Sequence, residues 1–205
     1  MTKTDVIYAY LFEKPGGPEE NFAAENICRL PAFRRERCLK YRNEADKRAC
    51  IIAYLMLEKG LAERFGAAGP VSFIYNENGK PYLREYPDIF FSLSHSEGRV
   101  VCALADFEIG ADIESIRPFD METAGLVCGR GELKRLARSR DPERLFCRFW
   151  TEKESRAKAK GLGASLKQNT GEGRFLYIYA ADYIVTICHG KSGIPILCTE
   201  QCNTF

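Results

Sequence analysis

Three carboxylates and one lysine have the types and spacing needed to hold a metal ion beside a phosphate. Asp112 and Glu114 are two residues apart, so on a β-strand their side chains point to the same face. Glu154 and Lys158 are four residues apart, so on a helix their Cβ atoms lie about 5–6 Å from each other. If folding gathers the three acids, their like charges require a positive partner. Magnesium fits, because it takes hard oxygen ligands and completes its octahedron with water and phosphate oxygens.

A plainer interpretation of the same residues is also open. Asp112 and Glu114 could be solvent-facing residues of an edge strand, and Glu154 an exposed residue of a helix. An isolated Asp-x-Glu followed by a distant glutamate favours this plainer interpretation. Further residues suited to phosphate binding are needed to favour the site.

Such residues occur elsewhere in the chain. Arg34 and Arg37 are three residues apart and share one face of a predicted helix. Gly79-Lys80-Pro81 places a lysine in a tight turn. Ser94 and His95 end an apolar strand and can donate hydrogen bonds to phosphate oxygens. A basic helix face or a single histidine is usually structural, so it is the combination that indicates a phosphate site.

The elements that must position these residues follow from hydrophobic periodicity and from Gly and Pro. Strands are predicted over residues 6–12, 71–75, 89–94, 99–105, 107–114, 175–181, 182–188 and 194–197. Helices are predicted over residues 19–30, 33–65, 121–128, 132–137 and 142–160. Residues 14–18 should stop the first strand, a break is expected near Asn43, and Gly161-Leu162-Gly163 should end the last helix. The alternation in 107–114 predicts an antiparallel sheet with one buried side.

The order of strand, helices and strands occurs twice, over residues 1–105 and 106–205. This order predicts an α+β fold of two similar halves. No low-complexity linker separates them, so the halves should share an interface. A site built from both halves should lie in the cleft between them.

Composition limits the possible functions. The chain has 205 residues and a formal charge of +2, which argues against a protein whose whole surface binds nucleic acid. Its nine cysteines include no CxxC pair, so we expect reduced thiols in a cytoplasmic protein. The first residues lack the pattern of a secretory signal, and no apolar run approaches about 18 residues, so no membrane association is expected.

Four motifs together carry a family resemblance. They are Gly-Lys-Pro at 79–81, Phe-Ser-Leu-Ser-His-Ser at 91–96, Gly-x-Asp-Ile-Glu at 110–114, and Trp-x-x-Lys-Glu-Ser at 150–155 with Lys158 beyond it. Their order and spacing over about residues 34–163 resemble the 4′-phosphopantetheinyl transferases of the surfactin-synthetase-activating type. The chain departs from that family at Ala111, where a larger aliphatic residue is usual, and over residues 118–145.

The resemblance implies a fold and a role for each residue. It implies an intramolecular pseudo-dimer with coenzyme A as co-substrate in the cleft between the halves. Three acids match the family's magnesium ligands, and a group of cationic and polar residues matches the family's coenzyme A contacts. The implied magnesium ligands are Asp112, Glu114 and Glu154; the implied coenzyme A ligands are Arg34, Arg37, Lys80, Pro81, Ser94, His95 and Lys158.

The resemblance also implies a reaction. The phosphopantetheine arm of coenzyme A would pass to a serine of an apo acyl or peptidyl carrier protein, and 3′,5′-ADP would be released. Lys158 would neutralise the charge that develops on the phosphates. Glu154 would accept the serine proton, directly or through a water. A monomer is expected, because the duplication supplies both halves. Two alternatives remain open: a magnesium-dependent hydrolase of coenzyme A or a nucleotide, and a coenzyme A-binding module without catalysis.

Overall fold

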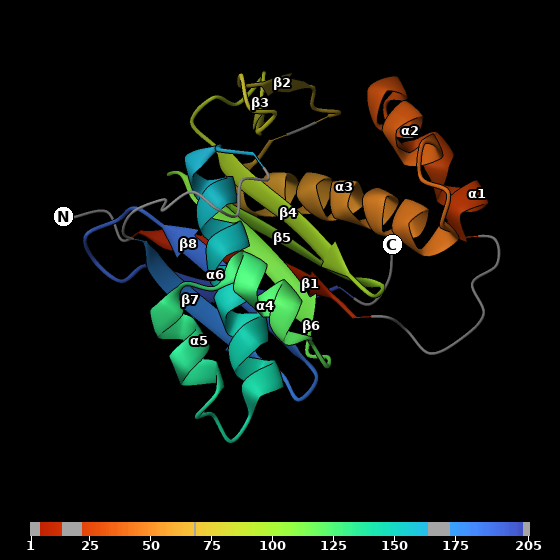
Figure 1. Ribbon diagram of the computed structural model, residues 1–205. Helices are drawn as coiled ribbons and strands as arrows, with labels where there is room; N and C mark the ends of the chain where they lie inside the picture. Colours follow the sequence, from red (N-terminus) through yellow and green to blue (C-terminus); the bar gives the residue numbers. More distant parts are fainter. Residues whose placement is uncertain (1–4, 14–21, 68, 164–172, 203–205) are drawn as a thin grey trace.

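Two regions, each a sheet with helices packed on it, make up this mixed α+β fold (Figure 1). The computed structural model describes residues 5–13, 22–67, 69–163 and 173–202. The predicted stop at 14–18 and the start of the helix predicted over 19–30 lie outside these residues. The first region contains β1 (Val6–Phe12), α1 (Phe22–Asn26), the 3-10 turn η1 (Ile27–Arg29), α2 (Ala32–Leu39), α3 (Glu44–Phe65), β2 (Phe73–Tyr75), β3 (Pro81–Leu83), β4 (Phe90–Ser96) and β5 (Arg99–Ala105).

The second region follows directly along the chain. It contains β6 (Ile109–Ser115), α4 (Met121–Val127), α5 (Arg130–Leu136), α6 (Pro142–Lys160), β7 (Arg174–Tyr179), β8 (Tyr183–His189) and β9 (Ile196–Gln201). Most of the predicted elements are confirmed to within a few residues of their ends, but strand β3 was not predicted. Residues 40–43 separate α2 from α3, which confirms the break predicted near Asn43.

Local chemistry explains where the two long helices begin and end. The side chain of Asn43 accepts a hydrogen bond from the backbone N–H of Ala45 and starts α3. Asp141 accepts one from the N–H of Arg144, and Pro142 occupies the first turn of α6. Helix α6 ends at Gly161, whose φ of +62° is the left-handed conformation that glycine adopts readily. The predicted helix stop is therefore confirmed.

The two regions have the same order of strands and helix along the chain. In the first, β1 is followed by α3, β4 and β5, and β5 pairs antiparallel with both β1 and β4. In the second, β6 is followed by α6, β7 and β8, and β8 pairs antiparallel with both β6 and β7. Strand β5 thus lies between β1 and β4, and β8 lies between β6 and β7. The same order of pairing occurs on both sides of residue 106.

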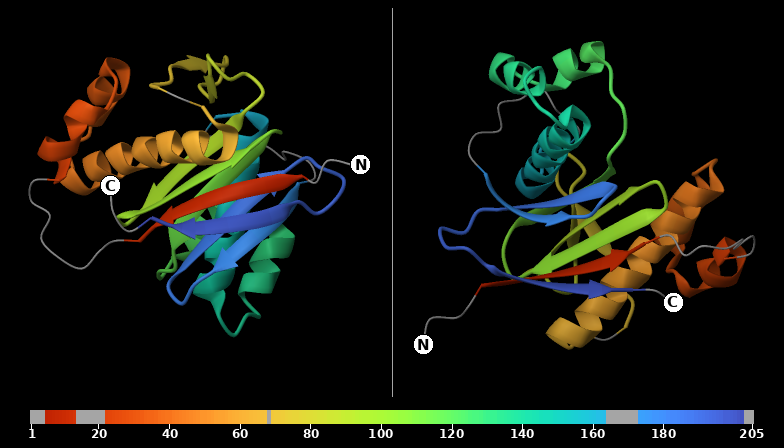
Figure 2. Two further views of the ribbon diagram at one scale, coloured as in Figure 1. Left: turned by 180° about the vertical axis from the view of Figure 1, so that it is seen from behind. Right: turned by 90° about the horizontal axis from the view of Figure 1, so that it is seen from below.

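The last strand, β9, joins the sheet of the first region. It was predicted to close the second region with β7 and β8, but it runs parallel to β1, with Val6 opposite Ile196 (Figure 2). The first sheet therefore has the order β4-β5-β1-β9, and the second has the order β6-β8-β7. The β2–β3 hairpin forms a separate small sheet.

The sheets pack face to face, with α3 outside one and α6 outside the other (Figure 2). Alternate residues of β1 explain this layering. Ala9 points into the core between the sheets, whereas Tyr10 points into the core beneath α3. Strand β6 is buried on both faces, so the prediction of one buried side was wrong for it. The reason is that α6 covers the face opposite the intersheet core.

The described residues contain no helix with both the length and the apolar character needed to span a bilayer.

Candidate functional site

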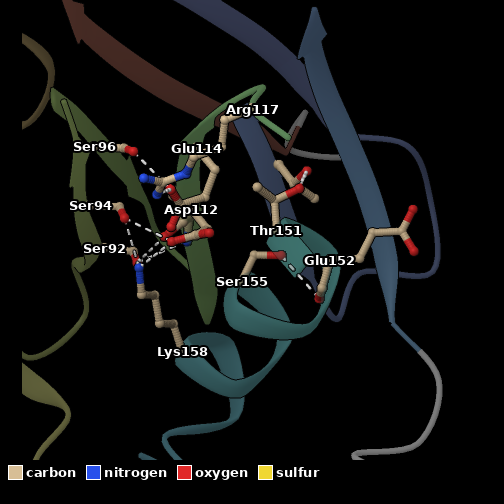
Figure 3. Close-up of polar contacts among 12 residues, drawn as sticks. Ser92, Ser94, Ser96, Asp112, Glu114, Arg117, Thr151, Glu152, Ser155 and Lys158 are labelled. Carbon is tan, nitrogen blue, oxygen red and sulfur yellow. Dashed lines mark hydrogen bonds and ion pairs between the residues drawn. The ribbon is translucent and has the colours of Figure 1, made fainter. Parts of the chain in front are cut away.

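Alternating serines of β4 face alternating acids of β6. Ser94 donates a hydrogen bond from Oγ to Oδ1 of Asp112 at 2.8 Å, and Ser96 donates one to Oε2 of Glu114 at 2.7 Å (Figure 3). The period of two residues in both strands makes this pairing possible, because every second side chain points the same way. Asp112 is only 3% exposed, so it is not a solvent-facing residue of an edge strand.

Lys158 of α6 completes this polar cluster. Its Nζ lies 2.7 Å from Oδ1 of Asp112 and 2.9 Å from Oγ of Ser94 (Figure 3). One ammonium therefore connects α6 to a strand of each region. Glu154, one turn earlier on α6, lines the same cavity as Lys158.

Gly110, two residues before Asp112, sets the distance between β6 and α6. A Cβ atom built on Gly110 would lie 2.0 Å from the carbonyl oxygen of Ser155 and 2.2 Å from the nitrogen of Ala159. Only glycine permits this approach of strand and helix backbones. The close approach is what brings Glu154 and Lys158 of the helix towards Asp112 of the strand.

The negative charge of Asp112 acts on the other two acids. Burial raises the pKa of Glu114, and the negative charge of Asp112 raises it further. Burial likewise raises the pKa of Glu154, again followed by the charge of Asp112. Lys158 counters both shifts. Glu114 and Glu154 thus keep raised pKa values although Lys158 is nearby and an Nη atom of Arg117 lies 3.7 Å from Oε2 of Glu114, so the cluster is short of positive charge.

This charge shortage and one unpaired atom fit a divalent cation. Oδ2 of Asp112 is buried and has no hydrogen-bond partner among the described residues. All three acids offer hard oxygen ligands of the kind magnesium takes. Within the part of the chain that the structure describes, however, no three His, Cys, Asp or Glu side chains converge into a metal-binding group. Lys158 pairs with Oδ1 of Asp112, which leaves Oδ2 as the unpaired oxygen.

A cavity of about 440 Å³ adjoins this cluster and is lined from both regions. Its volume falls within the roughly 300–1,000 Å³ of sites for small ligands. Seven of the ten predicted site residues line it: Arg34, Arg37, Lys80, Pro81, His95, Glu154 and Lys158. Ser94, Asp112 and Glu114 are not part of the lining. Ser94 and Asp112 join the group through Lys158, and Glu114 follows Asp112 on the same face of β6.

The two predicted arginines differ in environment. Arg34 is 6% exposed, and its guanidinium lies over the rings of Tyr54 and Phe73 at 5.7 and 5.5 Å. Its Nε is buried without a hydrogen-bond partner among the described residues. Arg37 is exposed on the next turn. Of the two arginines at the cavity wall, one is therefore fixed and buried and the other is solvated.

His95 forms another part of the wall. Its ring packs edge-on against Tyr41, with centroids 6.3 Å apart. Burial lowers the pKa of His95, so its imidazole is neutral at neutral pH. A neutral imidazole can still donate one hydrogen bond to an anionic ligand.

Lys80 lies in the β2–β3 hairpin, and its ammonium turns towards the second region. Nζ donates hydrogen bonds to the carbonyl oxygens of Ala159 at 2.9 Å and Ile109 at 3.3 Å, and it pairs with Glu108. Burial lowers the pKa of Lys80, while Glu108 raises it. Its role as a coenzyme A ligand remains a prediction. Its contacts in this structure tie the hairpin to the end of α6.

Sequence reasoning missed three contributors to this site. Ser96 supports Glu114, Tyr41 packs on His95, and Asn76 donates from Nδ2 to the carbonyl oxygen of Gly161 at 3.1 Å. Ser96 had a signal in the sequence, because it shares the two-residue period of Ser92 and Ser94. Tyr41 and Asn76 had none, since their partners are distant along the chain.

Known proteins resemble the chain across this site. The pattern of the 4′-phosphopantetheinyl transferase superfamily matches residues 108–190, which include the three acids and Lys158. A 4′-phosphopantetheinyl transferase of Bacillus subtilis is 31% identical over 167 residues, covering 78% of this chain and 72% of the relative. The chain belongs to the 4′-phosphopantetheinyl transferase superfamily.

Other members of the superfamily are similar over different spans. The 4′-phosphopantetheinyl transferase Sfp of Bacillus subtilis strain 168 is 28% identical over 163 residues, again covering 78% of this chain and 72% of the relative. AcpT of Salmonella typhimurium is 38% identical over 93 residues, covering 43% of this chain and 48% of the relative. The resemblance inferred from the four motifs is confirmed.

Proposed function

We propose that this transferase moves the 4′-phosphopantetheine arm of coenzyme A to a serine of an apo acyl or peptidyl carrier protein in a magnesium-dependent reaction. The observation that carries the proposal is the contact of Lys158 with Asp112 and Ser94 at the edge of a cavity that Arg34 and Arg37 also line. Acids for a cation and cations for phosphates therefore adjoin one space.

Coenzyme A binding is assigned to the wall formed by the first region. Arg34 and Arg37 would hold its 3′-phosphate, since both are cationic and line the cavity. His95 and Ser94 would donate further hydrogen bonds. Lys80 and Pro81, in the β2–β3 hairpin, are proposed to contact the nucleotide of coenzyme A.

Metal binding is assigned to Asp112, Glu114 and Glu154. The bound magnesium would supply positive charge to the pyrophosphate oxygens of coenzyme A. Lys158 would then turn from Asp112 towards the pyrophosphate, because the acid it now neutralises would have another partner. We propose that this exchange lets the three acids converge, which they do not do among the described residues while Lys158 bonds Asp112.

The reaction follows from these positions. The serine hydroxyl oxygen of the carrier forms a bond to the phosphorus that bears the pantetheine arm, and the pyrophosphate P–O bond breaks. The leaving group is 3′,5′-ADP. Glu154 lines the cavity beside Lys158 and would accept the serine proton, directly or through a water. Lys158 would stabilise the charge that develops on the transferred and leaving phosphates.

We infer further that residues 1–105 and 106–205 are the halves of an intramolecular pseudo-dimer with the active site in the cleft between them. The shared order of pairing in β1, β4, β5 and in β6, β7, β8 supports this. A chain that contains both halves would act as a monomer, and we propose that it works in the cytoplasm. Sedimentation equilibrium should give the mass of one chain; twice that mass would contradict this part of the proposal.

Mass spectrometry of an apo carrier protein incubated with coenzyme A, magnesium and the transferase tests the function. We expect the carrier to gain one phosphopantetheine arm on a serine. Asp112→Ala and Glu154→Ala should abolish this gain, whereas Glu152→Gln on the same helix should retain it, because Glu152 bonds Arg148 and Tyr177 away from the cavity. Normal transfer by either alanine variant would contradict the site assignment.

Two other outcomes correspond to the alternative functions. Release of phosphopantetheine into water without a carrier protein would indicate a hydrolase. Magnesium-independent binding of coenzyme A without any product would indicate a binding module. Comparing several apo carriers in the same assay would rank acyl against peptidyl carriers as partners.

A further inference from the structure

Two cysteines with no role in the transfer reaction lie in contact behind the arginines. Cys38 is near the end of α2 and Cys50 is in the second turn of α3, and their Sγ atoms are 2.6 Å apart. A covalent S–S bond is about 2.05 Å long, so only a small approach of the two sulfur atoms separates the pair from a disulfide. The side chains are buried, with 0% and 3% of their surfaces exposed.

Only one member of the pair borders the cavity. Cys50 is among its lining residues, whereas Cys38 lies behind it. The buried guanidinium of Arg34 approaches Cys50 from the same wall, with an Nη atom 3.5 Å from its Sγ and 3.4 Å from its carbonyl oxygen. A small molecule in the cavity can therefore reach Cys50 before it reaches Cys38.

The same contacts shift the pKa values of the two thiols in opposite directions. The hydrogen bond donated by the Cys38 thiol lowers the pKa of Cys50 against the effect of burial, and the charges of Arg34 and Arg37 lower it further. For Cys38 the hydrogen bond and burial raise the pKa. A thiolate is the nucleophilic form of cysteine. Cys50 thus has the character of an attacking group, and Cys38 that of a resolving thiol.

We propose that Cys50 and Cys38 form a thiol–disulfide exchange pair whose substrate is a small anionic disulfide that enters the cavity. Because Cys50 is buried and borders the cavity, a disulfide must enter the cavity to reach it, which favours a small compound over a protein. Arg34, Arg37 and Lys158 line that cavity and favour a negatively charged compound. This proposal does not rest on the proposed transfer reaction.

The exchange proceeds in two balanced steps. The Cys50 thiolate attacks one sulfur of the small disulfide, forming a mixed disulfide and releasing one thiolate. Cys38 gives its proton to the first thiolate released and attacks the Cys50 sulfur, forming the Cys38–Cys50 disulfide and releasing the second thiolate, which takes a proton from solvent. Two protein thiols are oxidised and the small disulfide is reduced to two thiols. The product joins α2 to α3 beside the arginines, and excess thiol reverses the reaction.

Glutathione disulfide is a suitable anionic probe for the full chain. After incubation, remaining thiols are alkylated and the peptides are mapped by mass spectrometry. We expect a linked peptide pair, two hydrogens lighter than its parts, that joins Cys38 to Cys50, and recovery of both thiols after dithiothreitol. Oxidation of Cys50 should be at least about tenfold faster than that of the buried Cys102, which has a raised pKa.

Variants separate the two roles. Cys38→Ser should stop at Cys50 carrying one glutathione, because no resolving thiol remains. Cys50→Ser should leave Cys38 unmodified, and Cys102→Ser should behave like the parent. Persistence of alkylatable Cys38 and Cys50 in the parent chain, while the exposed Cys28 and Cys198 become modified, would overturn the proposal. This parent result decides the matter even if a variant fails to fold.

Discussion

The ammonium nitrogen of Lys80 lies 2.9 Å from the carbonyl oxygen of Ala159, so the β2–β3 hairpin of the first region holds the last turn of α6 in the second. That turn contains Lys158. Asn76 adds a second hydrogen bond from the hairpin, to the carbonyl oxygen of Gly161. These bonds satisfy carbonyl groups that a helix end leaves without intrahelical partners.

Replacing this lysine should weaken the whole end of α6. Lys80→Met keeps most of the apolar part of the side chain but removes the hydrogen bonds, and we expect the free energy of unfolding to fall by about 2 kcal/mol. Thermal denaturation without coenzyme A measures this change. Lys47→Met is a matched control, because Lys47 pairs with a Glu44 side chain that is 72% exposed, and such pairs contribute about 0–1 kcal/mol. If Lys80→Met changed the KM for coenzyme A but left the stability unchanged, Lys80 would be a coenzyme A ligand and would not hold the end of α6.

The approach of β6 to α6 should not tolerate a side chain at position 110. Gly110→Ala places a Cβ against backbone atoms of Ser155 and Ala159, which cannot move independently of the helix. We expect a loss of about 3 kcal/mol in stability and a much lower rate of transfer. Gly125→Ala in α4 is the control, since nothing lies within 4 Å of the position that its Cβ would take and alanine favours a helix. Equal stability of the two variants would refute the packing argument.

Ser94 should affect catalysis more than stability. Its hydroxyl donates a hydrogen bond to Asp112 and accepts one from Lys158, so Ser94→Ala removes both hydrogen bonds. We expect kcat/KM to fall about tenfold, which corresponds to roughly 1.4 kcal/mol in transition-state binding. Ser72→Ala serves as control, because that hydroxyl donates to the exposed Glu85. Steady-state kinetics with an apo carrier protein measure both variants, and equal values would rule out this role for Ser94.

His189 should make the fold sensitive to acid. The ring is 4% exposed, its Nδ1 has no hydrogen-bond partner among the described residues, and burial lowers its pKa below the usual value, with Arg174 acting in the same direction. The unfolded chain therefore binds a proton more readily. Above the unfolded pKa of about 6.5, His189 is neutral in both states and the free energy of unfolding is at its full value. As the pH falls below that pKa, the unfolded chain binds the proton first and the free energy of unfolding decreases.

Melting temperatures between about pH 7 and pH 5 test this dependence. The parent should lose stability over that range, and His189→Gln should lose less. His95, whose pKa burial also lowers, remains in that variant and keeps part of the slope. Parallel curves for the parent and His189→Gln would contradict the assignment.

Much of the candidate site was predictable because it depends on local geometry. The two-residue period of a strand puts Asp112 and Glu114 on one face, and the helical spacing puts Glu154 beside Lys158, whatever the rest of the chain does. Gly161 ends α6 for an equally local reason, since its left-handed conformation suits glycine. The family motifs added the expectation that these faces meet.

The tertiary structure decided which distant groups share a contact. Lys158 reaches Asp112 and Ser94, Lys80 reaches Ala159, and Cys38 meets Cys50 only after the helices and sheets have packed. The parallel pairing of β9 with β1 is of the same kind. Each depends on which apolar faces bury one another across the whole core, a cooperative choice that the spacing of residues in one segment does not determine.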